Sequence, residues 1–184
     1  TINGANDTPV VIDPANPGGP PNPADPSKIY VRGNVFTDYD DNGLYFRTAP
    51  SDVLQGRVLS DLIVADGNAT VGIMARQDPY GEGLLQYTAE PLVEAGAEVV
   101  DDGGIVYDPA AENFDAEVGE IVAADPDAFV MIGFEESAQV LTSLFEAGYT
   151  PESGKKVYLV DGNVGNALGA ALPAGSMEGI RGTL

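Results

Sequence analysis

Four runs of apolar, strand-like residues follow one another along the second part of the chain. They lie at 71–75 (VGIMA), 97–100 (AEVV), 128–132 (AFVMI) and 157–160 (VYLV). Their first residues are 26, 31 and 29 positions apart (71 to 97, 97 to 128 and 128 to 157), which is the length of a strand plus a helix. The pattern predicts a series of βα units.

Between these runs the apolar spacing becomes that of a helix. Segment 113–125 places apolar residues at the i, i+4, i+7 and i+8 positions of one helical face, and segment 136–148 places them at i, i+1, i+4 and i+5. We also expect helices at 52–64 and 82–95, although Pro91 in the latter should kink the helix or remove one backbone hydrogen bond. The two apolar faces consist of Phe114, Val118, Ile121 and Val122, and of Val140, Leu141, Leu144 and Phe145.

Strands that are apolar on both faces must be covered on both faces. This requirement favours an α/β fold with three layers, in which a parallel sheet is flanked by helices. In such sheets ligands bind at the carboxyl ends of the strands, so the loops that follow the strands are where functional residues are expected.

The first part of the chain has a different composition. Residues 13–26 contain six Pro and two Gly, which excludes a helix or a central strand and predicts an extended arm. The regular pattern begins near residue 45. We therefore divide the chain into a region 1–45 and an α/β region 46–184.

Charge and residue content exclude several classes of function. The chain of 184 residues has 8 Lys and Arg against 29 Asp and Glu, a net charge of −21, and it contains no Cys and no His. Thiol chemistry, zinc fingers and a Ser-His-Asp triad are therefore excluded, and we expect no nucleic-acid partner because the charge repels phosphate. The apolar runs are shorter than the roughly 18 residues that span a bilayer.

The loop after 71–75 contains Tyr80 between Pro79 and Gly81. We expect this turn to raise Tyr80 above the sheet edge, where its ring and hydroxyl are available to a small ligand; the alternative is a tyrosine that only covers the next helix. Gly81 and Gly83 resemble the start of a dinucleotide fingerprint, but Gln86 replaces the third glycine. We therefore expect no cofactor.

Two further loops carry candidates for ligand contact. Phe134 follows 128–132 and is expected to pack on a ligand, Glu135 either touches the ligand or only favours the helix dipole, and Glu136 or Ser137 should cap the helix. Asp161 follows 157–160 and is suited to accept a ligand ammonium, unless it serves only as an Asx-turn residue.

A weak metal candidate lies in the first part of the chain. Asp38, Asp40 and Asn42 match positions 1, 3 and 5 of a calcium loop, but position 12 would be Ala49, so the bidentate Glu is absent. An ordinary acidic turn is the favoured interpretation.

Five segments, in this order and spacing, resemble the second lobe of a type I periplasmic binding protein, in particular the branched-chain amino-acid (Leu/Ile/Val) binding component of an ABC transporter. They are LYFRTAPSDVLQGRVLSDLI (44–63), VGIMARQDPYGEGL (71–84), PDAFVMIGFEESAQVLTSLFEAG (126–148), VYLVDGNVGN (157–166) and EGIRGTL (178–184).

The resemblance implies two lobes that are joined by hinge strands and close over a ligand. Phe46, Arg47 and Thr48 would form the crossing into the second lobe, and Gly182 and Thr183 would belong to the return crossing. Residues 1–45 are then an arm or the end of the first lobe. Since the chain begins at Thr1 without an initiator Met, we expect a processed or excised piece.

The resemblance also implies roles for the candidate residues. Tyr80 matches a tyrosine near the ligand, Asp161 an acidic residue that holds the α-ammonium, and Phe134 an aromatic contact. The groups that hold the α-carboxylate belong to the other lobe.

These observations predict an extracytoplasmic solute-binding lobe that binds a small amphipathic ligand, most simply an amino acid, and performs no catalysis. Its partners would be the first lobe and the membrane subunits of an ABC transporter. A ligand-sensing receptor domain of the same fold is the alternative. A hydrolase that uses carboxylates such as Asp78 and Asp161 is a further alternative, which the residue content favours less.

Overall fold

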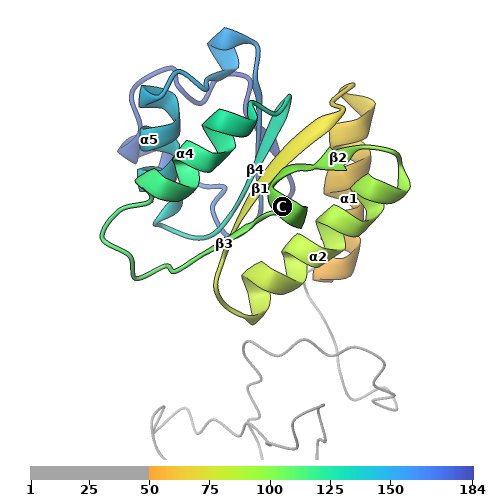
Figure 1. Cartoon of the computed structure of the whole chain (residues 1–184). Coiled ribbons are helices and arrows are strands. Elements are labelled where there is room, and N and C mark those ends of the chain that lie inside the picture. The colour runs from red at the N-terminus through yellow and green to blue at the C-terminus, as the bar shows by residue number, and fades with distance from the viewer. Residues whose placement is uncertain (1–49) are drawn as a thin grey trace, which may run out of the picture. The chain divides into compact units, whose positions relative to one another are not determined.

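A computed structural model of the chain describes residues 50–184 (Figure 1). Several expectations concern residues outside this range. They are the boundary at residue 45, the hinge candidates Phe46, Arg47 and Thr48, and the metal candidates Asp38, Asp40 and Asn42.

The described residues alternate between strands and helices, as the apolar pattern predicts. The helices are α1 (Asp52–Ala65), α2 (Pro79–Glu94), α3 (Val100–Gly103), α4 (Asp115–Ala124), α5 (Ser137–Glu146) and α6 (Asn166–Ala171), with a short 3-10 turn at Pro151–Ser153. The strands are β1 (Thr70–Arg76), β2 (Glu98–Val99), β3 (Ile105–Tyr107), β4 (Ala128–Ile132), β5 (Lys156–Leu159) and β6 (Arg181–Gly182).

All strand pairs found in residues 50–184 are parallel. The order is β2-β1-β4-β5-β6, and β3 also pairs with β1. Because β2 pairs with the start of β1 and β3 with its end, these two segments form one interrupted edge strand.

The interruption of the edge strand falls on α3, which is not a regular helix. Asp101 and Asp102 have left-handed backbone angles, with φ of 58° and 54°. The predicted strand at 97–100 is therefore shorter than expected, and β3 was not predicted because three residues carry too little periodicity to be recognised.

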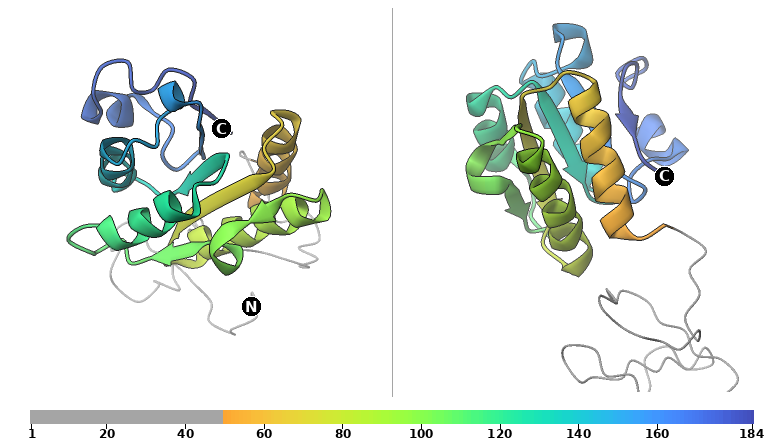
Figure 2. Two further views of the ribbon diagram at one scale, coloured as in Figure 1. Left: turned by 45° about the horizontal axis from the view of Figure 1, so that its top comes forward. Right: turned by 90° about the vertical axis from the view of Figure 1, so that its right-hand side faces the viewer.

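Alternate residues of each central strand enter two separate cores. Val71 and Ile73 of β1 pack with α1 and α2, whereas Met74 packs with α4 and α5. Figure 2 shows α1 and α2 on one side of the sheet and α4 and α5 on the other. The three-layer α/β fold with a parallel sheet is confirmed.

Pro91 does not end α2, which continues to Glu94. Because proline has no N–H, the carbonyl of Tyr87 loses its helical donor. Gly56 of α1 lies against this carbonyl, and a Cβ at Gly56 would be 2.5 Å from the Tyr87 oxygen. The carbonyl that lacks a helical donor thus lies at a close contact between the backbones of α1 and α2.

At the amino end of the strands, Asp127 links β4 to β1. Its Oδ2 accepts hydrogen bonds from the backbone N–H groups of Ala69 (2.9 Å) and Thr70 (3.0 Å), and its own N–H donates to Thr70 Oγ1 (2.9 Å). The two backbone donors lower the pKa of Asp127 below its ordinary value of 3.8.

Asp127→Asn should lower the free energy of unfolding at pH 7 by about 0.5–1 kcal/mol, a small effect because the carboxylate is exposed. A carboxyl group whose pKa is lowered by folding stabilises the protein above about pH 4, and this contribution is lost as the pH falls through the folded-state pKa. Urea denaturation between pH 7 and 2.5 should therefore show wild type and variant converging at the acid end.

Asp125→Asn is the matched control, because Asp125 pairs with Lys155 at 2.7 Å but is 74% exposed. We expect it to change stability by less than about 0.5 kcal/mol. A difference between wild type and Asp127→Asn that stays constant with pH would contradict the role assigned to the carboxylate.

Candidate functional site

Four loops meet at the carboxyl edge of the sheet. Parallel strands end at the same edge, so the residues that follow β1, β3, β4 and β5 lie close together although they are distant in sequence. The candidates Tyr80, Phe134, Glu135 and Asp161 belong to three of these loops.

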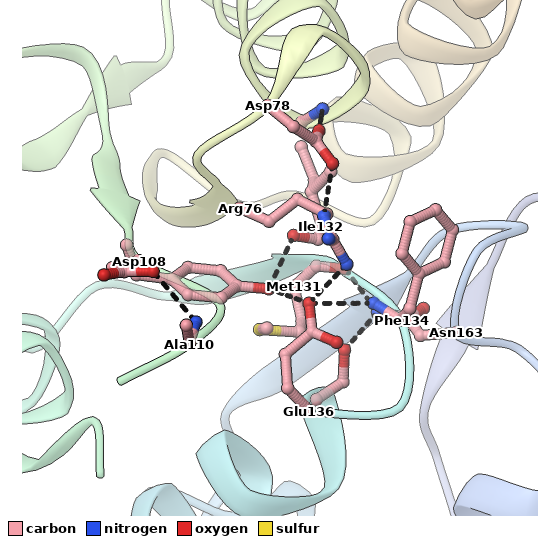
Figure 3. A network of polar contacts seen from close by, with 12 residues as sticks. Arg76, Asp78, Asp108, Ala110, Met131, Ile132, Phe134, Glu136 and Asn163 are labelled. Carbon is pink, nitrogen blue, oxygen red and sulfur yellow. Dashed lines mark hydrogen bonds and ion pairs between the residues drawn. The ribbon is translucent and has the colours of Figure 1, made fainter. Parts of the chain in front are cut away.

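The central charge of this edge is Arg76, the last residue of β1. Its Nε donates to Asp78 Oδ2 at 2.5 Å and its Nη1 to Glu136 Oε1 at 2.9 Å (Figure 3). The Arg76 side chain is only 18% exposed. Both partners are therefore needed to offset the cost of removing the guanidinium from water.

Glu136 connects three elements through one oxygen. Besides Arg76, its Oε1 accepts from the hydroxyl of Tyr107 (2.8 Å) and from the backbone N–H of Phe134 (3.2 Å). Burial and the hydrogen bond to Glu136 raise the pKa of Tyr107, so this hydroxyl remains a donor.

The expected helix-capping role of Glu136 or Ser137 is wrong. Glu136 is the N-cap position of α5 but makes no side-chain capping bond. Ser137 Oγ instead accepts from Asn163 Nδ2 at 3.0 Å, which ties the loop after β5 to the loop after β4. The carboxylate of Glu136 is used by Arg76, and ion pairing has displaced capping here.

Asp78 caps α2, and this cap determines where Tyr80 lies. Its Oδ1 accepts from Gly81 N–H at 2.7 Å, and Pro79 is the first residue of the helix. Tyr80 therefore lies in the first helical turn and not in the free-standing turn that the sequence suggested. A Cβ at Gly81 would collide with the carbonyl of Arg76, so only glycine permits this close approach.

The aromatic candidates form a stack. The rings of Tyr80 and Phe134 are nearly parallel, with centroids 5.2 Å apart and an interplanar angle of 13°. The guanidinium carbon of Arg76 lies 4.4 Å from the centre of the Phe134 ring, a cation–π contact. Gly162 lies at the edge of both rings, where an added Cβ would be 2.8 Å from the Tyr80 hydroxyl.

Asp161 joins this stack through its carboxylate. Its Oδ1 accepts from the Tyr80 hydroxyl and from Gln55 Nε2, each at 2.9 Å. Burial, followed by the negative charge of Asp161, raises the pKa of Tyr80, so the hydroxyl remains protonated and donates. Asp161 itself is exposed to solvent.

Glu135 occupies a different place from the other candidates. It is exposed and lines a cavity of about 260 Å³ between the loop after β4 and α6, together with Phe134 and Leu168. Neither Tyr80 nor Asp161 lines this cavity. The structure thus brings Tyr80, Phe134 and Asp161 together. It places Glu135 at a separate cavity that Phe134 also lines.

Sequence reasoning missed Arg76, Glu136, Tyr107 and Gln55 as parts of this site. One signal was present for Arg76, which is the only Lys or Arg between Arg57 and Lys155 and follows a buried strand. Gln55 carried no such signal, because its partners lie more than 100 positions away. Among residues 50–184 no group of three or more carboxylates is arranged to hold a metal ion.

Comparison with known proteins gives one weak sequence relative. No family model matches the chain. An uncharacterized protein of Methanocaldococcus jannaschii is 29% identical over 114 residues, which cover 59% of this chain and 27% of that protein.

Solved structures resemble the described lobe more clearly. An extracellular ligand-binding receptor from Rhodopseudomonas palustris matches with a TM-score of 0.62 and 22% identity, over 71% of this chain and 35% of the receptor. A leucine-binding protein from Thermotoga maritima matches with a TM-score of 0.58 and 18% identity, over 65% of this chain and 33% of that protein. A solute-binding protein of an ABC transporter from Rhodopseudomonas palustris, in complex with 3,4-dihydroxybenzoic acid, matches with a TM-score of 0.54 and 19% identity. The match covers 64% of this chain and 34% of that protein.

These matches show the fold of one lobe of a type I periplasmic binding protein, as the resemblance implied. The chain spans about a third of the length of these solved proteins. At such identities the similarity establishes the fold alone.

Glu136→Gln should destabilise the protein by about 2 kcal/mol, because Arg76 then keeps only one carboxylate while the shape of the side chain is retained. Urea denaturation at pH 7 measures this loss. The neighbouring exposed Glu135→Gln is the control and should change stability by less than about 0.5 kcal/mol. Equal effects of the two substitutions on the free energy of unfolding would show that the ion pair between Arg76 and Glu136 does not stabilise the protein.

Proposed function

We propose that this chain supplies one lobe of an extracytoplasmic solute-binding protein and holds the ammonium group of a small amphipathic ligand, most simply an amino acid. The observation that carries the proposal is the juxtaposition of the exposed carboxylate of Asp161 with the stacked rings of Tyr80 and Phe134. A carboxylate beside an aromatic wall suits a ligand with one charged and one apolar part.

The hydrogen bonds of Asp161 support binding of an ammonium. Both donors, Tyr80 and Gln55, use Oδ1, and no donor from residues 50–184 reaches Oδ2. The two bonds orient the carboxylate before any ligand arrives, which lowers the cost of ordering it on binding.

The distribution of positive charge also favours an amine over an acid at this lobe. Arg76 is the basic residue at the site, and its guanidinium is already used by Asp78, Glu136 and the Phe134 ring. Arg57 pairs with Asp61 and Glu94, and Arg181 with Asp66. A ligand carboxylate would therefore have to be held outside this lobe, on the surface that closes over it.

A ligand-sensing receptor of the same fold would use the same contacts and differ only in its partner. An acid/base enzyme receives less support, because both oxygens of Asp78 are engaged, one by Arg76 and the other by the start of α2. The structural neighbours are themselves described as receptors or binding proteins.

The remaining parts of the proposal rest on the resemblance to two-lobed binding proteins. We propose the first lobe and ABC-transporter membrane subunits as partners, residues 46–184 as the ligand-binding lobe, and Phe46–Thr48 with Gly182 and Thr183 as the hinge crossings. In the part of the chain that the structure describes, the helices are too short or too polar to cross a bilayer.

Titration of this chain with leucine, followed by NMR, should shift the resonances of Tyr80 and of the loop around Asp161 at millimolar concentrations, since one lobe supplies only half of the contacts. Isoamylamine, which keeps the ammonium and the side chain, should give the same shifts. The acid 4-methylpentanoate, which lacks the ammonium, should give none.

Asp161→Asn should weaken the leucine and isoamylamine responses at least tenfold through loss of the charge-assisted contact. Glu82→Gln removes one exposed negative charge from the first turn of α2 and is the control, with a change of less than twofold. Stronger shifts with 4-methylpentanoate or 3,4-dihydroxybenzoate than with the amines would refute the proposal.

Two substitutions at Tyr80 separate the aromatic wall from the hydroxyl. Tyr80→Ala removes the ring that stacks on Phe134 and should weaken amine binding about tenfold, while the half-buried position lets the lobe remain folded. Tyr80→Phe keeps the stack, loses only the bond to Asp161, and should cost about twofold to threefold. Circular dichroism checks the fold; an unfolded Tyr80→Ala variant would assign this ring to packing instead.

A further inference from the structure

Gln55 is the side chain through which Asp161 meets the C-terminal segment. Its Nε2 donates two hydrogen bonds, one to Asp161 Oδ1 at 2.9 Å and one to Thr183 Oγ1 at 3.1 Å. These partners are 106 and 128 positions away in the sequence. Gln55 itself lies in the second turn of α1 and is only 9% exposed.

The amide group of Gln55 has only one orientation that satisfies both neighbours. Its two N–H protons point to a carboxylate oxygen and to a hydroxyl oxygen, whereas the rotated amide would direct its oxygen at the carboxylate. A change at Asp161 therefore alters how well the same nitrogen holds Thr183.

Thr183 continues β6 alongside β5. Its backbone N–H donates to the carbonyl of Leu159 at 3.2 Å, and Gly182 approaches the same carbonyl so closely that an added Cβ would be 2.5 Å from its oxygen. With only Arg181 and Gly182 paired as a strand, this segment has few backbone bonds of its own. Two side-chain interactions supplement them, the ion pair of Arg181 with Asp66 and the hydrogen bond from Gln55 to Thr183.

We propose that Gln55 is a positioning residue that couples the carboxylate of Asp161 to the anchoring of the Gly182–Thr183 segment. This coupling rests on the proposed function, in which Asp161 accepts the ligand ammonium and Gly182 and Thr183 belong to the return crossing between the lobes. Binding free energies are reciprocal, so an event at Asp161 that strengthens the Gln55 bond holds Thr183 more firmly, and a firmly held Thr183 improves the carboxylate site.

The coupling can be measured without any ligand, by amide hydrogen exchange of the full chain followed by NMR. Asp161→Asn should accelerate exchange of the Thr183 N–H about threefold to tenfold, although the two side chains share only Gln55 as a partner. Gln55→Met, which keeps the length of the side chain but has no donor, should accelerate it by a similar factor. In the Gln55→Met background, Asp161→Asn should add less than about 1.5-fold.

Two further variants separate this coupling from general destabilisation. Gln86→Met removes a comparable bond from an amide to a carboxylate, to Glu90 at 2.8 Å on the exposed side of α2, and should leave Thr183 unchanged. Gln55→Glu, which faces Asp161 with a second carboxylate, should accelerate Thr183 most strongly.

The proposal is overturned if Asp161→Asn leaves Thr183 exchange unchanged, or if it accelerates exchange equally with and without Gln55. Acceleration of Thr183 exchange by Gln86→Met to the same extent as by Asp161→Asn would likewise overturn it, by showing an effect of destabilisation that does not depend on Gln55. Failure of the proposed function looks different, because absence of amine binding leaves this cycle of variants unaffected.

Discussion

The partly buried positive charge of Arg76 is the constraint on which the candidate site depends. A guanidinium at this depth is costly unless carboxylates compensate it, so Asp78 and Glu136 must both be in place. Asp78 also starts α2, which positions Tyr80, and Glu136 holds the backbone of Phe134. One electrostatic requirement thus determines where both rings of the aromatic wall lie.

Negative charge at this edge is divided between carboxylates that are paired with Arg76 and one that is exposed. The chain carries a net charge of −21, and two of its carboxylates, those of Asp78 and Glu136, pair with Arg76 and are 28% and 15% exposed. Asp161 is left as the exposed carboxylate that borders the aromatic stack, and its donors are the uncharged Tyr80 and Gln55. No cationic side chain among residues 50–184 forms a salt bridge with Asp161, which is the condition that the proposed binding of an ammonium requires.

The candidate site has a rigid part, the stacked rings of Tyr80 and Phe134, and an exposed part, the carboxylate of Asp161. The Tyr80 and Phe134 rings are stacked, and the Phe134 ring is further held by Arg76, which limits their conformational freedom before binding. Asp161 is exposed and is linked to the C-terminal segment by the hydrogen bonds of Gln55. Under the function proposed above, the stacked rings would stay fixed while the contacts of Asp161 respond to closure.

The sequence by itself determined the α/β class, the positions of β1, β4 and β5 and the helices between them, because continuous apolar runs and the 3.6-residue apolar period are local properties. It also placed Tyr80, Phe134 and Asp161 at one edge, since parallel strands end together. Only the tertiary structure decided the partners of Arg76, the division of the edge strand at Asp101 and Asp102, the place of Glu135 at a separate cavity, and the link from Gln55 to Thr183. Charge pairing and close packing join residues that no local pattern relates, so these features appear only when the chain is folded.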